Sequence, residues 1–310
     1  MPKGLVLNFH RELDPVLFEQ RILAVKKKYR FVGLPELQTL IQQKNGLANV
    51  CHVSFDDGEV SFFEIIYPLL KKHNVPVSLF VSPQIIATNS NFWFQEIESF
   101  DDAHFRLFIA QYLGVTISQL EGYTTLSILK CLTIRSILDL IQAYQQANGL
   151  SAAPPFNMNV SQLLEVETSG LVTVGAHTMN HPILANETNE ISYYEITKSV
   201  KELEKMLGHA IDYFAYPNGV EKLDYTQREV EYLQQAGIKF SFTTNGDHLM
   251  NLTSVYQVPR VYYPTMLGLK PAHPLILWRL SLGKKWPKIR RSYVTENDMR
   301  FALLKLLAKK

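Results

Sequence analysis

Val53-Ser54-Phe55-Asp56-Asp57-Gly58 joins an apolar run to two adjacent aspartates and a glycine. The apolar run begins at Ala48, and a run of this length closed by glycine is typical of a buried strand that meets a loop. Two neighbouring carboxylates resist joint ionisation unless a cation or a hydrogen-bond donor satisfies them. A metal ion bound by one carboxylate resolves this conflict and leaves the other ionised as a base. An ordinary turn is the alternative, because Asp and Gly favour turns.

A second stretch, Leu171 to Pro182, favours the metal over the turn. Its short β-branched run ends at Gly175, and two histidines, His177 and His181, follow four residues apart. Positions i and i+4 share a face in a helical turn, so we expect both imidazoles to reach one ion. Two histidines and one carboxylate form a common catalytic zinc set that leaves a position open for water.

Three motifs, in this order, resemble the polysaccharide deacetylase superfamily, also called the NodB-homology carbohydrate esterases. They are Ser54-Phe55-Asp56-Asp57-Gly58, His177-Thr178-Met179-Asn180-His181 and Phe214-Ala215-Tyr216-Pro217-Asn218-Gly219. The resemblance covers about residues 5 to 265, with a long interruption. It implies that Asp56 is the general base. It also implies a divalent metal held by Asp57, His177 and His181, for which zinc is the first expectation and iron, cobalt or nickel are alternatives.

The third motif forms a wall of the active site in that family. The resemblance places Tyr216 and Pro217 in this wall and implies that the backbone N–H of Asn218 helps to bind the oxyanion. The usual family arginine, two residues before the proline, is Ala215 here. Arg260 is the candidate that supplies the missing charge, and a surface salt bridge is the alternative interpretation of this residue.

The stretch Gly4 to His10 is expected to form a first strand that ends in a histidine. One branch of the superfamily, which includes the poly-N-acetylglucosamine deacetylases, has a strand near the N-terminus that ends in Tyr-His, and that histidine is the general acid. Phe9 stands in place of the tyrosine here. The resemblance therefore implies that His10 is the general acid, and a histidine bonded to a neighbouring loop is the alternative.

Expected strands and helices alternate up to Val81, as in parallel βα units, and the alternation then stops. Residues 88–155 contain no further clear strand, so this stretch is expected to be an insertion with structure of its own. We expect an α/β fold, a distorted and incomplete (β/α) barrel of the NodB-homology type. Its parts are the barrel at 1–87 and 156–267, the helical insertion at 88–155 and a basic helical tail at 268–310.

The helical insertion is expected to contain helices at 102–113, 117–121 and 126–147. It is either a brace on the barrel or a lid or specificity wall, because loops at the carboxyl ends of strands carry function. Its aromatic side chains Phe92, Trp93 and Phe94 either stack on sugar rings or pack in a core.

Charge and composition exclude some partners. The chain of 310 residues has a net charge of +2, so no general polyanion-binding surface is expected. Its two cysteines, Cys51 and Cys131, give no disulfide framework. No stretch is long enough to span a bilayer and the N-terminus lacks a signal-peptide core, so we expect a cytoplasmic protein.

The tail has a composition of its own. Residues 279–310 hold ten Lys or Arg against Glu296 and Asp298, interleaved with apolar side chains that include Trp286. One interpretation is peripheral contact with an anionic membrane surface. The other is a tail helix that packs its leucine face on the protein. No recognised nucleic-acid-binding module accompanies the charge, so we expect no nucleic-acid partner.

The resemblance implies a metal-dependent hydrolase that removes an N-acetyl group from an amino sugar. Without an export signal, a nucleotide- or lipid-linked glycan precursor is expected rather than finished wall polymer. One alternative keeps the site but acts on another small amide. A second alternative is a catalytically silent glycan-binding protein, which the departures at Phe9 and Ala215 favour and the complete acidic and histidine set opposes.

Overall fold

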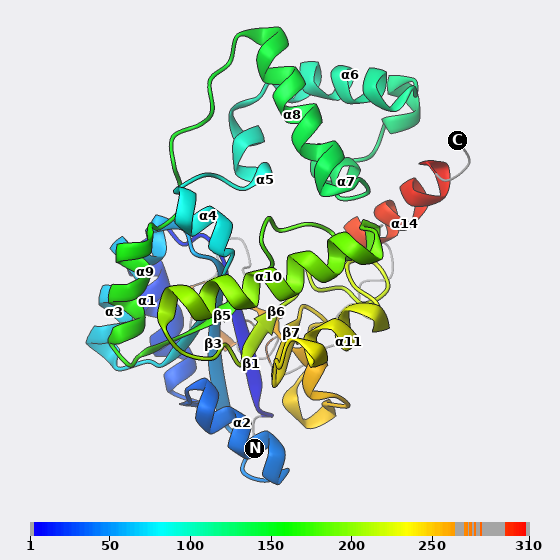
Figure 1. Ribbon diagram of the computed structural model, residues 1–310. Coiled ribbons are helices and arrows are strands. Elements are labelled where there is room, and N and C mark those ends of the chain that lie inside the picture. The colour runs from blue at the N-terminus through cyan, green and yellow to red at the C-terminus, as the bar shows by residue number, and fades with distance from the viewer. Residues whose placement is uncertain are drawn as a thin grey trace.

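The computed structural model describes residues 3–263 and 295–307, and between them the single positions 270, 271, 273, 274, 276 and 280. A parallel sheet with helices packed around it forms the centre of the molecule (Figure 1). Its strands are β1 (Leu5–Phe9), β2 (Arg30–Phe31), β3 (Val50–Asp57), β4 (Val77–Val81), β5 (Val172–Ala176), β6 (Tyr213–Ala215), β7 (Phe240–Thr243), β8 (Val258–Pro259) and β9 (Val261–Tyr262).

The sheet curls into a nearly closed barrel with one unsealed seam. The strands lie in the order β8-β7-β6-β5-β4-β3-β1-β9, and β2 pairs with β3. Neighbouring strands pair in parallel, and within the described residues no pairing joins β8 to β9. The predicted distorted, incomplete (β/α) barrel is confirmed.

Strand β3 shows why the apolar sequence becomes a central strand. All eight of its residues are buried, as expected for a parallel strand that is covered on both faces. Its register places Phe55 opposite Phe9 of β1, and Asp57 opposite Val81 of β4. The two aspartates therefore stand at the carboxyl edge of the barrel, the edge where parallel α/β folds bind their ligands.

Helices cover the outside of the barrel (Figure 1). Each lies between strands in the sequence, as βα units require. They are α1 (Pro15–Lys26), α2 (Leu34–Gln43), α3 (Tyr67–His73), α4 (Pro83–Thr88), α9 (Val160–Thr168), α10 (Asn189–Leu207) and α11 (Gln227–Gln235).

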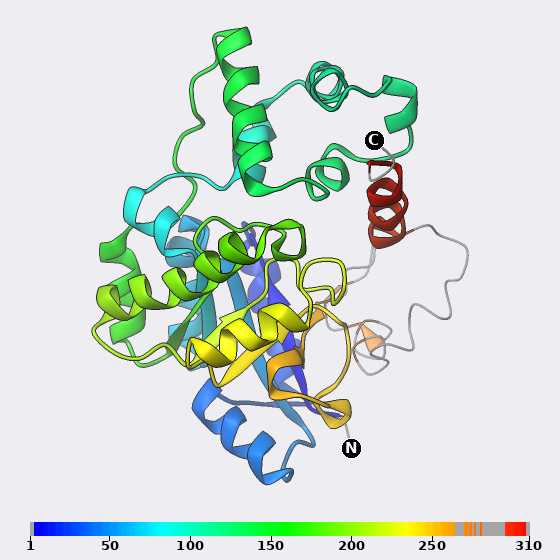
Figure 2. The ribbon, with the colours of Figure 1, turned by 45° about the vertical axis from the view of Figure 1, so that its right-hand side comes forward.

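Residues 88–155, the helical insertion of the sequence analysis, lie between β4 and β5. They contain α5 (Trp93–Glu96), α6 (Asp102–Leu113), α7 (Thr125–Leu129) and α8 (Ile134–Asn148), grouped beyond the carboxyl edge of the barrel (Figure 2). Their buried apolar side chains form a cluster that also includes Leu303 of α14 (Glu296–Leu307). The single helix predicted for 126–147 is wrong. The chain starts a new helix at Ile134, because the Thr133 side chain accepts a hydrogen bond from the N–H of Ser136 and caps α8.

The remaining sequence predictions concern the cysteines, the membrane and the tail. Cys51 and Cys131 are both buried free thiols. Among the described residues, no helix is both long and apolar enough to cross a membrane. The tail helix α14 places a leucine in the apolar cluster of the helical insertion. Trp286 and most of the basic residues of the tail lie outside the described residues.

Candidate active site

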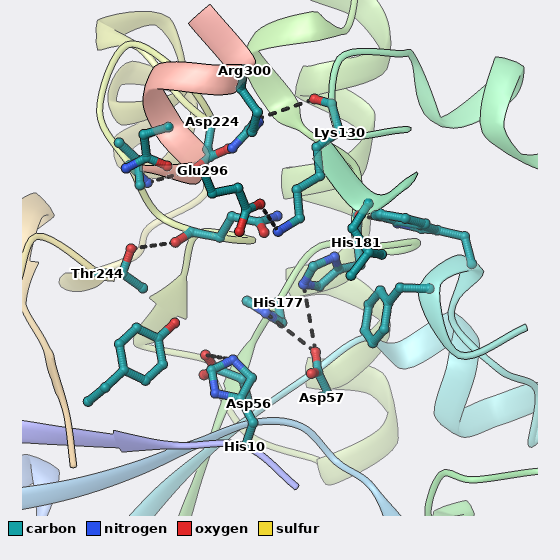
Figure 3. Close-up of a pocket in the computed structure, with 17 residues that line it drawn as sticks. His10, Asp56, Asp57, Lys130, His177, His181, Asp224, Thr244, Glu296 and Arg300 are labelled. Atoms are coloured by element: carbon teal, nitrogen blue, oxygen red, sulfur yellow. Dashed lines mark hydrogen bonds and ion pairs between the residues drawn. The ribbon is translucent and has the colours of Figure 1, made fainter. Parts of the chain in front are cut away.

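Asp57, His177 and His181 come together at the carboxyl edge of the barrel (Figure 3). The Nε2 atom of each histidine lies 3.7 Å from Oδ1 of Asp57, and one ligand atom from each of the three residues lies within 4.8 Å of the others. All three residues are buried. Within the described part of the chain, Oδ1 of Asp57 has no hydrogen-bond partner. A buried carboxylate oxygen without a partner, facing two imidazole nitrogens, fits a bound cation, because burying it alone is costly.

The tautomer of His177 is set by its other ring nitrogen. Nδ1 lies 2.7 Å from the carbonyl oxygen of Ala215, to which it donates, so the lone pair of Nε2 faces Asp57. A histidine oriented in this way by a backbone carbonyl is the usual arrangement of a metal ligand. Ala215 therefore contributes to the site through its backbone carbonyl group, which orients His177.

The segment from His177 to His181 is a loop, so the helical reason for their pairing was wrong. Thr178 and His181 adopt left-handed φ angles of 64° and 56°. The buried carboxylate of Glu195 on α10 holds this loop by accepting the N–H groups of Met179 and Asn180, each at 2.9 Å. The loop turns both imidazoles inward, which a helical turn was expected to do.

Asp56 faces a different set of partners from those of Asp57. Its Oδ1 lies 2.6 Å from Nη1 of Arg260, and its Oδ2 accepts a hydrogen bond from Nδ2 of Asn8 at 3.2 Å. Burial alone would raise the pKa of Asp56, but the positive charge of Arg260 holds that pKa below its usual range. Asp56 is therefore ionised at neutral pH.

Burial and the charge of Asp56 raise the pKa of Asp57 well above its usual range. The surroundings thus move the pKa values of the two neighbouring carboxyl groups in opposite directions, as in many acid–base sites. Without a further cation, these surroundings favour the neutral form of Asp57. A divalent metal beside Asp57 would stabilise its ionised form, and the same argument predicts a metal from two adjacent aspartates.

Several hydrogen bonds hold Arg260 in place beside Asp56. It is 1% exposed. Its Nη1 also donates to Oδ1 of Asn8 at 3.0 Å, and its Nε donates to the carbonyl oxygen of Thr243 at 3.3 Å. The alternative of a surface salt bridge is wrong. Arg260, at the seam between β8 and β9, provides Asp56 with the positive charge that Ala215 cannot provide.

Replacing Arg260 with methionine should lower the free energy of unfolding by about 3–5 kcal/mol, because a buried carboxylate loses its partner. Urea unfolding at neutral pH measures this loss. The pKa of Asp56 is depressed in the folded state, so the pair stabilises the protein above the unfolded-state pKa of about 3.9. That contribution disappears as the pH falls through the lower folded-state value. Arg135→Met, at an exposed ion pair on α8, should leave the free energy of unfolding almost unchanged. Equal effects of the two variants would contradict the structural importance of Arg260.

His10 lies beside Asp56 and remains accessible. Its Nε2 is 3.7 Å from Oδ2 of Asp56, and its side chain is 43% exposed. The ring stacks on Tyr262 with centroids 5.5 Å apart. A histidine that borders the cavity and remains partly exposed can reach a bound substrate, as a general acid must.

The third motif contributes less of the cavity wall than predicted. Asn218 lines the cavity, and its buried side-chain Nδ2 has no partner among the described residues. Tyr216 and Pro217 do not line it. Tyr216 is fully buried, and its ring stacks on Tyr225 with centroids 3.8 Å apart. The prediction of Tyr216 as a substrate-facing residue therefore needs correction: its side chain belongs to the barrel core.

A cavity of about 420 Å³ lies among the Asp57-His177-His181 group, Asp56, His10 and Asn218. Most side chains of the wall farthest from Asp57 are charged and come from the helical insertion, the loop after β6, and α14 (Figure 3). Trp93 and Phe94 line the cavity beside His181, whereas Phe92 is buried. Sequence reasoning missed nine further lining residues, which are Leu126, Lys130, Val220, Asp224, Thr244, Tyr262, Glu296, Asn297 and Arg300.

A parallel (β/α) barrel that carries an Asp-His-His group and a second aspartate at its carboxyl edge has the fold and site expected of a NodB-homology deacetylase. The family model described as polysaccharide deacetylase matches residues 43–241. The chain belongs to the polysaccharide deacetylase family. No curated protein sequence matches it significantly.

Solved structures show the same fold. The deacetylase PplD from Streptococcus pyogenes, in complex with acetate, is 18% identical with a TM-score of 0.58, covering 91% of this chain and 99% of that one. IcaB from Ammonifex degensii is 20% identical with a TM-score of 0.57, covering 90% and 98%. A de-N-acetylase from Aggregatibacter actinomycetemcomitans is 16% identical with a TM-score of 0.55, covering 87% and 98%.

Proposed function

We propose that this protein is a metal-dependent hydrolase that removes an N-acetyl group from an amino sugar in a glycan or glycan precursor. Membership of the polysaccharide deacetylase family supports glycan deacetylation. The unpartnered Oδ1 of Asp57, 3.7 Å from two imidazole nitrogens, is the observation that supports the metal. Zinc is the first expectation for two histidines and one carboxylate, and iron, cobalt or nickel are alternatives.

Asp57, His177 and His181 are the residues that would hold the metal. When bound, the metal supplies Lewis acidity, which lowers the pKa of water and polarises the acetyl carbonyl group. Asp56 accepts the proton of the attacking water. Arg260 occupies Oδ1 of Asp56. The other oxygen, Oδ2, accepts a hydrogen bond from Asn8, lies near His10 and has a second lone pair that can take that proton.

The other residues act on the carbonyl oxygen and on the leaving group. The backbone N–H of Asn218, at the cavity wall, donates to the oxygen as negative charge develops on it. Burial lowers the pKa of His10 and the negative charge of Asp56 opposes this shift. In its protonated form, His10 donates its proton to the nitrogen of the departing amine as the C–N bond breaks. Trp93 and Phe94 offer apolar ring faces to the sugar on the side of His181.

Removing the metal is the direct test of this function. Dialysis against a chelator should reduce the release of free amine from acetylated sugars at least about 100-fold, because water then lacks its activator. Adding back one equivalent of zinc should restore it, and elemental analysis should find one metal per chain. Full turnover by metal-free protein would contradict the proposal.

The same assay separates the alternatives. Turnover of cyclic amides without turnover of acetylated sugars would show that the site acts on another small amide. Metal binding without any hydrolysis would favour the silent glycan-binding protein. The complete set of Asp56, Asp57, His177 and His181 around one cavity supports the enzyme over this last candidate.

A further inference from the structure

The tail helix α14 reaches the active-site cavity from outside the residues that the family model matches. Glu296, Asn297 and Arg300 all line the cavity. Leu303 of the same helix is fully buried in the apolar cluster of the helical insertion. Both ribbon views show α14 beside α7, and the two helices are in contact (Figures 1 and 2). The helix is thus docked through apolar side chains and presents polar ones to the cavity.

Arg300 links two parts of the cavity wall that are far apart in sequence. It is 1% exposed. Its Nη1 lies 2.7 Å from Oδ1 of Asp224, which is in the loop after β6, and its Nη2 donates to the carbonyl oxygen of Lys130 at 3.3 Å. The other oxygen of Asp224 accepts the N–H of Val220, two residues from Asn218. Arg300 therefore holds the loop of the predicted oxyanion donor against the helical insertion.

A second ion pair closes the same side of the cavity. Nζ of Lys130 lies 2.7 Å from Oε1 of Glu296, and both side chains line the cavity (Figure 3). Their charges, with those of Asp224 and Arg300, are balanced within the wall. An unpaired anion or cation is therefore not what this wall recognises. Lys130 and Glu296, whose side chains are partly exposed, can instead exchange hydrogen bonds with sugar hydroxyl groups.

The helical insertion is also joined to the barrel on the side of His181. Nε1 of Trp93 donates to the carbonyl oxygen of His181 at 3.1 Å. The N–H of Ile134 donates to the carboxylate of Glu187 at 2.6 Å. These two hydrogen bonds and the contacts of Arg300 join the helical insertion to the barrel on two sides of the cavity, which makes the cavity a pocket. An internal unit of a polymer needs a groove that is open at both ends. The cavity of about 420 Å³ lies toward the lower end of the range of roughly 300–1,000 Å³ that small-ligand pockets occupy.

We propose that α14 forms an end wall of the substrate cavity and restricts the enzyme to the terminal unit of a glycan, with Arg300 as the positioning residue. This inference rests on the proposed sugar deacetylation. It specifies which unit of the glycan is deacetylated, which neither family membership nor the Asp57-His177-His181 group specifies. Arg300 touches no reacting atom, and it acts by holding Asp224 and the main chain at Lys130.

The probes are tetramers of N-acetylglucosamine in β-1,4 and β-1,6 linkage, with the deacetylated unit located by tandem mass spectrometry. The metal-loaded wild-type protein should release its first acetyl group from a terminal unit. Arg300→Met should deacetylate internal units as well. Its KM should rise by roughly 10-fold while kcat changes less, because positioning rather than chemistry is lost. Its metal content should stay at the wild-type value.

Arg135→Met on α8, an exposed arginine in an ion pair, is the matched control and should keep the terminal preference. If Arg300→Met fails to fold, Glu296→Gln removes the Lys130 pair from a half-exposed side chain and should shift the preference in the same direction. First cleavage at internal units by the wild type, or an unchanged preference in the folded variants, overturns the end wall. No acetate released from any acetylated sugar by metal-loaded protein instead rejects the proposed function, and the end wall with it.

Discussion

Replacing Asp56 with asparagine should reduce deacetylation by about 10²- to 10⁴-fold, the usual contribution of a positioned general base. Asparagine keeps the shape of the side chain but cannot accept the proton of water. Asp56 is outside the Asp57-His177-His181 group, so bound metal should remain near the wild-type stoichiometry. Initial rates of amine release and elemental analysis of the same preparations measure both effects.

Stability supplies a second readout of the same variant. Arg260 is buried and would lose its charged partner, so the free energy of unfolding should also fall. Asp212→Asn is the matched control, because Asp212 pairs with Lys239 next to the amino end of β6, away from the cavity. That control should leave turnover unchanged. Wild-type turnover by Asp56→Asn would remove Asp56 from the role of base.

Replacing His177 with alanine should lower bound metal well below one equivalent and reduce activity by more than about 100-fold. Loss of an outer-shell partner alone typically costs 10- to 100-fold in metal affinity or activity, and His177 belongs to the ligand group itself. Elemental analysis after dialysis measures the metal, and amine release measures the activity.

His209→Ala is the control for His177→Ala. His209 is exposed and pairs with Glu167 on the outside of the barrel, so neither metal content nor turnover should change. An unchanged metal stoichiometry in His177→Ala would contradict the assignment of this histidine as a ligand.

The barrel was predictable because parallel strands that are buried on both faces have sequences that are continuous apolar runs. The run that becomes β3 ends in Asp56 and Asp57, and the β-branched run of β5 is followed by His177. Strands that run in one direction bring their carboxyl ends to one edge. A residue directly after an apolar run is thereby placed near the site without any knowledge of the intervening chain.

Predictions that needed more than local pattern were less accurate. Tyr216 belongs to the third motif but points into the core. The chain bends after it, and Asn218, with a left-handed φ of 58°, takes the cavity side. The pair formed by Asp224 and Arg300 has no signal at all in the sequence. It joins two polar residues from separate segments, and neither lies in a motif.

The two departures from the family pattern have structural explanations. Phe9 packs against Phe18, Phe55 and Tyr263 with ring centroids 5.5 to 6.0 Å apart, so an apolar ring fits there without a hydroxyl group. The charge absent at Ala215 reaches Asp56 from Arg260. Neither departure removes a group that the proposed reaction uses.

The unsealed seam of the barrel has a consequence for how the enzyme matures on the ribosome. Strand β3 with the two aspartates, and β5 with the histidine loop that follows it, emerge well before Arg260 at the seam, and α14 emerges later still. Nascent chains generally fold from their N-terminal part first. A growing polypeptide can therefore assemble the motif-bearing strands early, yet it gains the counter-charge of Asp56 and the cavity-lining helix α14 only afterwards.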